Sequence, residues 1–283
     1  MNRSIIKIAK PVVERVPPIA RAYRNIRDRA QLKRHPVQTP LGFLLVGNRS
    51  MEGGDFEPQE TRLIESILPL VDNVVDVGAN IGYYVCLARS RSKHVIAFEP
   101  IALNVQLLLR NIELNGWKDG LEIYPLAVSN RVGIARMHGG GTGASLVTGW
   151  AGVSENYASY LPVTTLDTTL NGRLRQKRSL FIVDVEGAEA DVLAGAAAQL
   201  ALVPKPLWMV EIIFSQRGGI GKNPNFRRSF ETFWQNGYQC CTANDDRRPV
   251  SAEIIRDMEE SGIDMLNCTN FLFADKRSID LLK

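Results

Sequence analysis

The hydrophobic positions of this chain fall into short apolar runs separated by longer amphipathic stretches. The runs NVVDVG, HVIAFE, LEIYPLAV, SLFIVDVEG and PLWMVEIIF have the length and composition of buried strands. Between them, GYYVCLARSRS, PIALNVQLLLRNIELNG and AEADVLAGAAAQL carry apolar residues at helical spacing, and EPQETRLIESILPL before them does the same. Such an alternation favours parallel strands joined by right-handed crossovers. We therefore predict an α/β fold of the doubly wound, Rossmann-like class.

The alternation lapses once and changes near its end. From Ser129 to Leu161 the sequence becomes glycine-rich and predicts an inserted hairpin with a glycine-rich tip. After the fifth apolar run come a helix over FRRSFETFWQN, a strand YQCCTA, a helix opened by Ser251 and a strand NFLFAD. The aromatic residues of FRRSFETFWQN share one helix face, which predicts core packing. The two closing strands predict an antiparallel C-terminal edge on a mostly parallel sheet.

Residues 1–58 predict a basic helical extension and a cover segment, and residues 59–283 one α/β domain. Within the extension, TPLGFLLVGNRSMEGGDF predicts a small hairpin or a cover over a neighbouring site. Of the net charge of +4, residues 1–35 carry ten Lys/Arg and two acidic residues, a balance of +8 that leaves −4 for the rest. Such a segment suits an anionic membrane surface, and a solvated helix packed on the body is the alternative.

Several functional classes are disfavoured by composition. With 283 residues, 45% hydrophobic and 23% charged, the chain has the composition of an ordinary folded protein. No stretch approaches about 18 uninterrupted apolar residues, and Lys7, Lys10 and Glu14 interrupt what would be the apolar region of a signal peptide. We expect a cytoplasmic protein, with peripheral membrane contact through residues 1–35 as an open hypothesis. The four cysteines show no C-x-x-C spacing, which disfavours zinc and disulfides.

The turn after the first apolar run is the first candidate site, because ligands of open α/β sheets lie beyond the carboxyl ends of the strands. The turn reads DVGANIG and lacks the three glycines with which nicotinamide enzymes approach a pyrophosphate. Asp76 stands in place of the first glycine, and its charge repels a pyrophosphate but suits a cation such as S-adenosylmethionine. Glu99 ends the next strand and can accept both ribose hydroxyls of an adenosine. We therefore predict S-adenosylmethionine as the cofactor.

The motifs VVDVGANIGYY, VIAFEP, RNIELNG, LAVSN, GGGTGASL, VTTLD, IVDVEGAEADVL and MVEI occur in the order and spacing of one family. In this respect the chain resembles the FkbM family of S-adenosylmethionine-dependent methyltransferases from about Val74 to Asp275. The resemblance implies a class I methyltransferase fold and O-methylation of a hydroxyl on a sugar, a glycan or a small natural product. Gly78 then allows close backbone approach, Gly82 close helix-to-strand packing, and Ala127 lies near the adenine at the end of the third strand. The implied cofactor set is Asp76, Gly78, Ala79, Asn80, Gly82, Glu99 and Ala127.

An alcohol loses its proton during methyl transfer, so a general base is expected beside the methyl donor. Asp184 and Glu186 follow the fourth strand and would share a face if that strand continued. For Glu186 and Glu189, stabilisation of the following helix N-terminus is the alternative. His138 beside the triple glycine is a further base candidate, with an exposed loop histidine as the alternative. The three catalytic candidates are Asp184, Glu186 and His138.

Other residues receive weaker assignments. Glu211 at the end of the fifth strand is a secondary site candidate, and with Asp184 and Glu186 it is weak evidence for Mg²⁺, so we predict no metal. Asp167 is expected to cap a short helix. A nucleic-acid methyltransferase, a nicotinamide-dependent oxidoreductase and a non-catalytic binding module are the alternative functions. The chain lacks the motifs expected of amino-methylating and cytosine-methylating nucleic-acid enzymes, and it lacks the three-glycine turn of nicotinamide-dependent enzymes. A non-catalytic binding module should show a damaged cofactor set, and this sequence shows no such damage.

Overall fold

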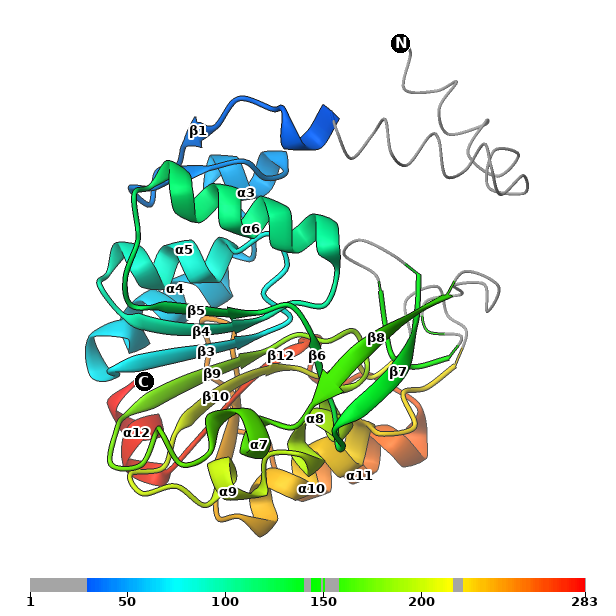
Figure 1. Cartoon of the computed structure of the whole chain (residues 1–283). Helices are drawn as coiled ribbons and strands as arrows, with labels where there is room; N and C mark the ends of the chain where they lie inside the picture. Colours follow the sequence, from blue (N-terminus) through cyan, green and yellow to red (C-terminus); the bar gives the residue numbers. More distant parts are fainter. Residues whose placement is uncertain (1–29, 140–143, 149, 151–157, 216–220, 283) are drawn as a thin grey trace.

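The computed structural model describes residues 30–139, 144–148, 150, 158–215 and 221–282. Its main element is a seven-stranded sheet in the order β11-β12-β10-β9-β3-β4-β5 (Figure 1). Neighbours from β10 to β5 pair in parallel, whereas β12 runs antiparallel to both β10 and β11. The doubly wound sheet with an antiparallel C-terminal edge is therefore confirmed. The strands are β3 (Asn73–Val77), β4 (His94–Phe98), β5 (Leu121–Tyr124), β9 (Ser179–Val183), β10 (Leu207–Glu211), β11 (Gln239–Thr242) and β12 (Asn270–Ala274).

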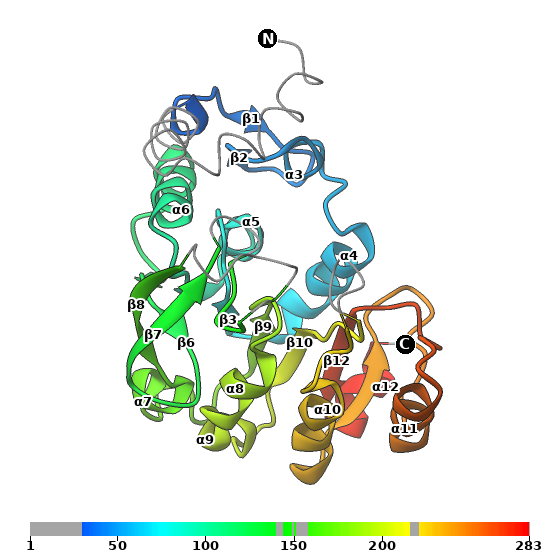
Figure 2. The same ribbon diagram turned by 90° about the vertical axis from the view of Figure 1, so that its right-hand side faces the viewer.

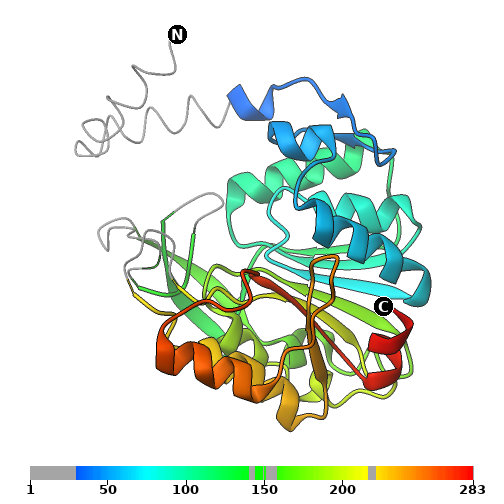
Figure 3. The same ribbon diagram turned by 180° about the vertical axis from the view of Figure 1, so that it is seen from behind.

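Helices cover both faces of this sheet (Figures 1 and 3). One face packs on α4 (Pro58–Ile67), α5 (Tyr83–Ser90), α6 (Ala102–Leu114) and α12 (Lys276–Leu281). The other packs on α7 (Leu166–Leu170), α8 (Glu189–Ala194), α9 (Ala197–Leu200), α10 (Phe226–Gln235) and α11 (Ala252–Ser261). Strand residues alternate between the two cores, with Val74 on the first side and Val75 on the second. Both faces of the central strands are thus apolar, as the uninterrupted runs predict.

The glycine-rich insertion forms a second, three-stranded sheet that stands beside the main one (Figures 1 and 2). It consists of β6 (Ala127–Val128), β7 (Gly133–His138) and β8 (Ala158–Thr164) in the order β6-β8-β7, with β7 and β8 antiparallel. The predicted hairpin is confirmed, and its glycine-rich tip at residues 140–143 lies outside the described residues. Ala127 does not end the third strand, because β5 stops before Pro125, which has no N–H to extend the ladder.

The N-terminal cover segment packs on α6. Its hairpin of β1 (Val37–Gln38) and β2 (Leu44–Leu45) is as predicted, whereas the short helix α3 (Arg49–Gly53) is not. Side chains of α6 hold the segment, because Asn111 and Asn115 each accept a backbone N–H from it at 2.8 Å. The basic extension up to residue 29 lies outside the described residues. The division at residue 58 stays a prediction.

Local differences from the sequence prediction have steric causes. The helix expected over AEADVLAGAAAQL is broken into α8 and α9 at Gly195, where a Cβ would lie 2.2 Å from the Ser129 carbonyl oxygen. Helix α6 begins at Ala102 with Ile101 as its N-cap, two residues later than expected. The aromatic residues of α10 pack in the core, as predicted. Among the described helices, none has the length and apolarity needed to cross a bilayer.

Candidate active site

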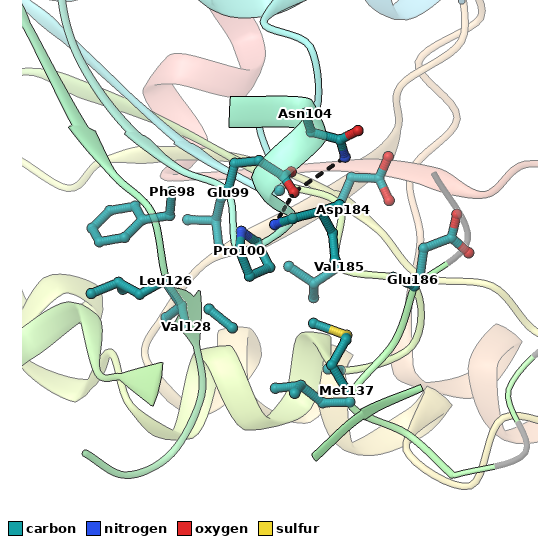
Figure 4. A pocket seen from close by; sticks show the side chains of 17 residues that line it. Phe98, Glu99, Pro100, Asn104, Leu126, Val128, Met137, Asp184, Val185 and Glu186 are labelled. Carbon is teal, nitrogen blue, oxygen red and sulfur yellow. Dashed lines mark hydrogen bonds between the residues drawn. The ribbon is translucent and has the colours of Figure 1, made fainter. Parts of the chain in front are cut away.

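A hollow of about 590 Å³, open to solvent, lies at the carboxyl ends of β3, β4 and β9. Glu99 and Asp184 of its lining directly follow strands, and Glu186 lies in the loop after β9; Figure 4 shows these three side chains above Leu126, Val128 and Met137. The main sheet supplies the acidic wall, and the insertion adds part of the apolar wall. The residues on which the site depends are Gly78, Glu99, Asp184 and Glu186 on the first wall, and Met137, Ala144 and Leu146 from the insertion.

Glu99 is held rigidly at the end of β4. Its carboxylate accepts the backbone N–H groups of Asn80 and Ile101, both at 2.8 Å, and the side-chain amide of Asn104 at 3.2 Å. The side chain is only 4% exposed, and burial raises the pKa of this carboxyl, although the three hydrogen bonds oppose the rise. Glu99 is therefore a fixed acceptor on the pocket wall, as the AFEP motif predicts for a ribose-binding carboxylate.

The glycines of the first turn serve packing between elements. Gly78 has a φ of +92°, and a Cβ there would lie 1.8 Å from the carbonyl oxygen of Asp184, so the turn needs glycine to meet the end of β9. Gly82 has a φ of +87°, and a Cβ would lie 2.2 Å from Leu108 of α6. The expected helix-to-strand packing at Gly82 is thus helix-to-helix packing. Asn80 is also left-handed, and its buried Oδ1 has no partner among the described residues.

Asp76 corrects the electrostatic argument made from the sequence. It belongs to β3, is 3% exposed, and is not among the described residues that line the hollow. Burial, followed by the neighbouring charges of Asp184 and Glu99, raises its pKa from 3.8 to about 8. The Asp76 carboxyl is therefore mostly protonated near neutral pH in the protein without ligand. The carboxylates on the wall are those of Glu99, Asp184 and Glu186.

Asp184 and Glu186 both line the hollow, but they do not share a strand face. Strand β9 ends at Val183, and Glu186 then adopts a φ of +53° and Gly187 one of +94°. The carboxyl of Glu186 accepts the indole N–H of Trp150 at 3.1 Å. Trp150 was missed from the sequence, since no local pattern links residues 36 positions apart. The only local hint in the sequence was Gly187 next to Glu186, which marks a tight turn but does not identify Trp150 as the partner.

The structure also shows the surroundings of His138, Glu189 and Asp167. His138 ends β7, is 3% exposed and contacts the Thr148 hydroxyl through Nε2 at 3.2 Å, so the alternative of an exposed loop histidine is wrong. Glu189 accepts the N–H of Gly187 at 2.9 Å, and burial raises its pKa to about 8. Asp167 is structural as predicted, although its carboxylate accepts the first N–H groups of α9 and not those of its own helix.

Glu211, the secondary site candidate, and the histidine His94 lie away from the described lining of the hollow. Glu211 ends β10, is buried, and pairs in register with Asn270 of β12. His94 begins β4, at the opposite end of that strand from Glu99. Among the described residues, no three His, Cys, Asp or Glu side chains are grouped as a metal site.

The chain is similar to known methyltransferases in sequence and in fold. Residues 76–240 match the model of the methyltransferase FkbM domain. No curated protein sequence matched the chain. Similar solved structures include the ribosomal protein L11 methylase of Lactobacillus delbrueckii subsp. bulgaricus, with 12% identity, a TM-score of 0.43 and coverage of 80% of this chain and 78% of that chain. Another is an O-methyltransferase from Bacillus cereus in complex with SAH, with 11% identity, a TM-score of 0.43 and coverage of 77% and 80%.

Proposed function

This chain belongs to the FkbM family of S-adenosylmethionine-dependent methyltransferases, and we propose that it methylates a hydroxyl oxygen on a sugar, a glycan or a small natural product. The observation that carries the proposal is that two acidic residues, Asp184 and Glu186, both line the hollow after the end of β9. A neutral hydroxyl oxygen is a weaker nucleophile than an amine nitrogen, so its methylation gains from a base that removes the hydroxyl proton as the new bond forms. Two carboxylates beside the donor supply such a base.

The residues around the hollow fit S-adenosylmethionine. Glu99 offers a fixed carboxylate for the ribose hydroxyls, and the apolar side chains of Ile101, Leu126 and Val128 offer a surface for the adenine. The buried Oδ1 of Asn80, which has no hydrogen-bond partner among the residues that the structure describes, offers an acceptor for the ammonium group. In this proposal Asp76, Gly78, Ala79 and Gly82 shape the turn, and Ala127 borders the adenine. When bound, S-adenosylmethionine supplies an electrophilic methyl carbon on a positively charged sulfur.

The chain's own residues then have three tasks. Glu99 fixes the position of the nucleoside end, so that the reacting carbon is presented in a single orientation. Met137, Ala144 and Leu146 of the insertion exclude water from the other side. Asp184 and Glu186 accept hydrogen bonds from the acceptor hydroxyl, and one of them takes its proton. His138 stays a weaker base candidate, because it is not among the described residues of the lining.

The test has two steps. Isothermal titration with S-adenosylmethionine and with NADH measures the cofactor preference, and binding of NADH alone would overturn the assignment. Incubation with methyl-labelled S-adenosylmethionine and a fractionated host extract then identifies the acceptor. We expect the label on hydroxyl oxygens in the glycan, lipid or small-metabolite fraction. Label in nucleic acid, or on nitrogen, would contradict the proposal.

A peripheral contact with anionic membranes through residues 1–35 is a second part of the proposal, supported by the +8 balance of that segment. Arg110 of α6 donates to the carbonyl groups of Leu32 and Arg34, so deletion is best limited to residues 1–29. We expect this deletion to abolish sedimentation with vesicles that contain anionic lipid. Equal sedimentation of the full and shortened chains would retire the membrane contact.

A further inference from the structure

The loop after β9 and the insertion meet at Glu186, although they are far apart in sequence. The hydroxyl of Ser145 donates to the backbone carbonyl of Glu186 at 2.6 Å. The indole N–H of Trp150 donates to Oε2 of the same residue at 3.1 Å. The insertion therefore holds both the main chain and the side chain of one residue on the pocket wall.

The backbone of this loop depends on that contact. Glu186 has a φ of +53°, a left-handed conformation that residues with a side chain adopt rarely. The next residue, Gly187, has a φ of +94°, and a Cβ there would lie 2.4–2.6 Å from three atoms of the Trp150 ring. Glycine at this position makes room for the indole. The loop and the ring thus fit each other closely.

The chemistry of the indole decides what the contact does. An indole N–H can only donate, so it favours the ionised form of the carboxyl and fixes its orientation. Trp150 is 1% exposed, so its ring is not a surface for the acceptor. Glu186, in contrast, lines the hollow beside Asp184 (Figure 4). The tryptophan therefore acts on the pocket through Glu186.

We propose that Trp150 is a positioning residue that holds Glu186 ionised and aimed at the acceptor hydroxyl, which makes Glu186 the general base. The inference rests on the proposed O-methylation and selects among its base candidates. In that step the acceptor oxygen forms its bond to the methyl carbon while the carbon–sulfur bond breaks. The bonding pair stays on sulfur, which becomes a neutral thioether, and the hydroxyl proton passes to Glu186.

Trp150→Phe removes the N–H and keeps most of the ring. Trp208→Phe is the matched control, because Trp208 is also buried and donates to the Tyr238 hydroxyl at 3.3 Å, but it lies in the core of β10. With the acceptor fraction found by labelling, we expect Trp150→Phe to lower kcat about tenfold at neutral pH. We expect the acid limb of its pH–rate profile to move up by about one pH unit. The affinity for SAH should change less than about twofold in both variants.

A second measurement needs no acceptor. Protonation of a carboxylate in contact with an indole changes the emission of that indole, so the tryptophan fluorescence of the SAH-bound protein is followed against pH. We expect the transition in the wild type and in Trp208→Phe, and its loss in Trp150→Phe and Glu186→Gln. A transition that survives in Trp150→Phe would overturn the assigned contact.

The outcomes separate the two proposals. If label enters hydroxyl groups and the two tryptophan variants give the same pH–rate profile, Trp150 is only structural and this inference fails. If label enters nitrogen or nucleic acid, the proposed function fails. The fluorescence titration then still decides whether Trp150 holds the ionised carboxylate.

Discussion

Replacing Asp76 by Asn should change how the stability of the protein depends on pH. The Asp76 carboxyl keeps its proton up to a pKa of about 8 in the folded protein, against 3.8 in the unfolded chain. Between these values the unfolded state releases a proton that the folded state retains. The free energy of unfolding therefore falls as the pH rises, by about 1.4 kcal/mol per pH unit for this group. From pH 5 to 7 the loss is about 2.7 kcal/mol.

An asparagine does not titrate, so the Asp76→Asn variant lacks this loss. The free energy of unfolding of the variant, minus that of the wild type, should grow by about 2.7 kcal/mol from pH 5 to 7. Any constant cost of burying the amide cancels in that change. Glu189 has a similarly raised pKa but is present in both proteins, so its contribution cancels as well.

Urea unfolding at pH 5, 6 and 7 without ligand measures the difference. The control is Asp119→Asn, which makes the same substitution at an exposed aspartate just before β5. Parallel stability curves for the wild type and Asp76→Asn would refute the reasoning. They would mean that Asp76 ionises normally despite its burial.

Three further predictions concern the turn and the cofactor. Glu99→Gln should weaken S-adenosylmethionine binding about 10- to 100-fold in isothermal titration, because a charge-assisted hydrogen bond is lost; an unchanged affinity would place the ribose elsewhere. Gly78→Ala should lower the melting temperature far more than Gly116→Ala, since only the first Cβ meets the Asp184 carbonyl oxygen, whereas nothing lies within 4 Å of the second; equal losses would disprove the clash. A cationic ligand favours the ionised form of Asp76, so the affinity for S-adenosylmethionine should rise with pH up to about 8. Isothermal titration in buffers of different ionisation enthalpy should show that binding releases protons. An affinity that does not change with pH would contradict this coupling.

The sheet was predictable because its signal is local. Four of the five apolar runs form strands that are buried on both faces, and the third forms the partly buried edge strand β5, so the runs stand out from the amphipathic helices. The antiparallel C-terminal edge was also expected from the sequence, although the connection between β11 and β12 contains the helix α11. The need for glycine at residue 195, between α8 and α9, was not predictable, since the close neighbour is the carbonyl oxygen of Ser129, which is 66 positions away in sequence.

The sequence predicted where the site lies but not the protonation state of its acidic residues. Strand ends locate Glu99, Asp184 and Glu186 on one hollow, because the carboxyl ends of parallel strands meet at one edge. The raised pKa of Asp76 depends on burial and on the charges of Asp184 and Glu99, which are distant from it in sequence. No sequence motif shows this environment. Trp150 lies in a glycine-rich segment without periodicity, and its contact exists only once the insertion folds onto the main sheet.

Glu99 and Glu186 on the pocket wall are held by contacts of different range along the sequence. Glu99 is fixed by N–H groups 2 and 19 positions away, inside the strand–helix units that form the sheet. Glu186 is held by Ser145 and Trp150, 41 and 36 positions away, in a segment that is separate from the seven strands of the main sheet. A change at Ser145 or Trp150 should therefore disturb Glu186 and leave the hydrogen bonds that hold Glu99 in place. Within one fold, this arrangement allows the acceptor to vary and the methyl donor to remain the same.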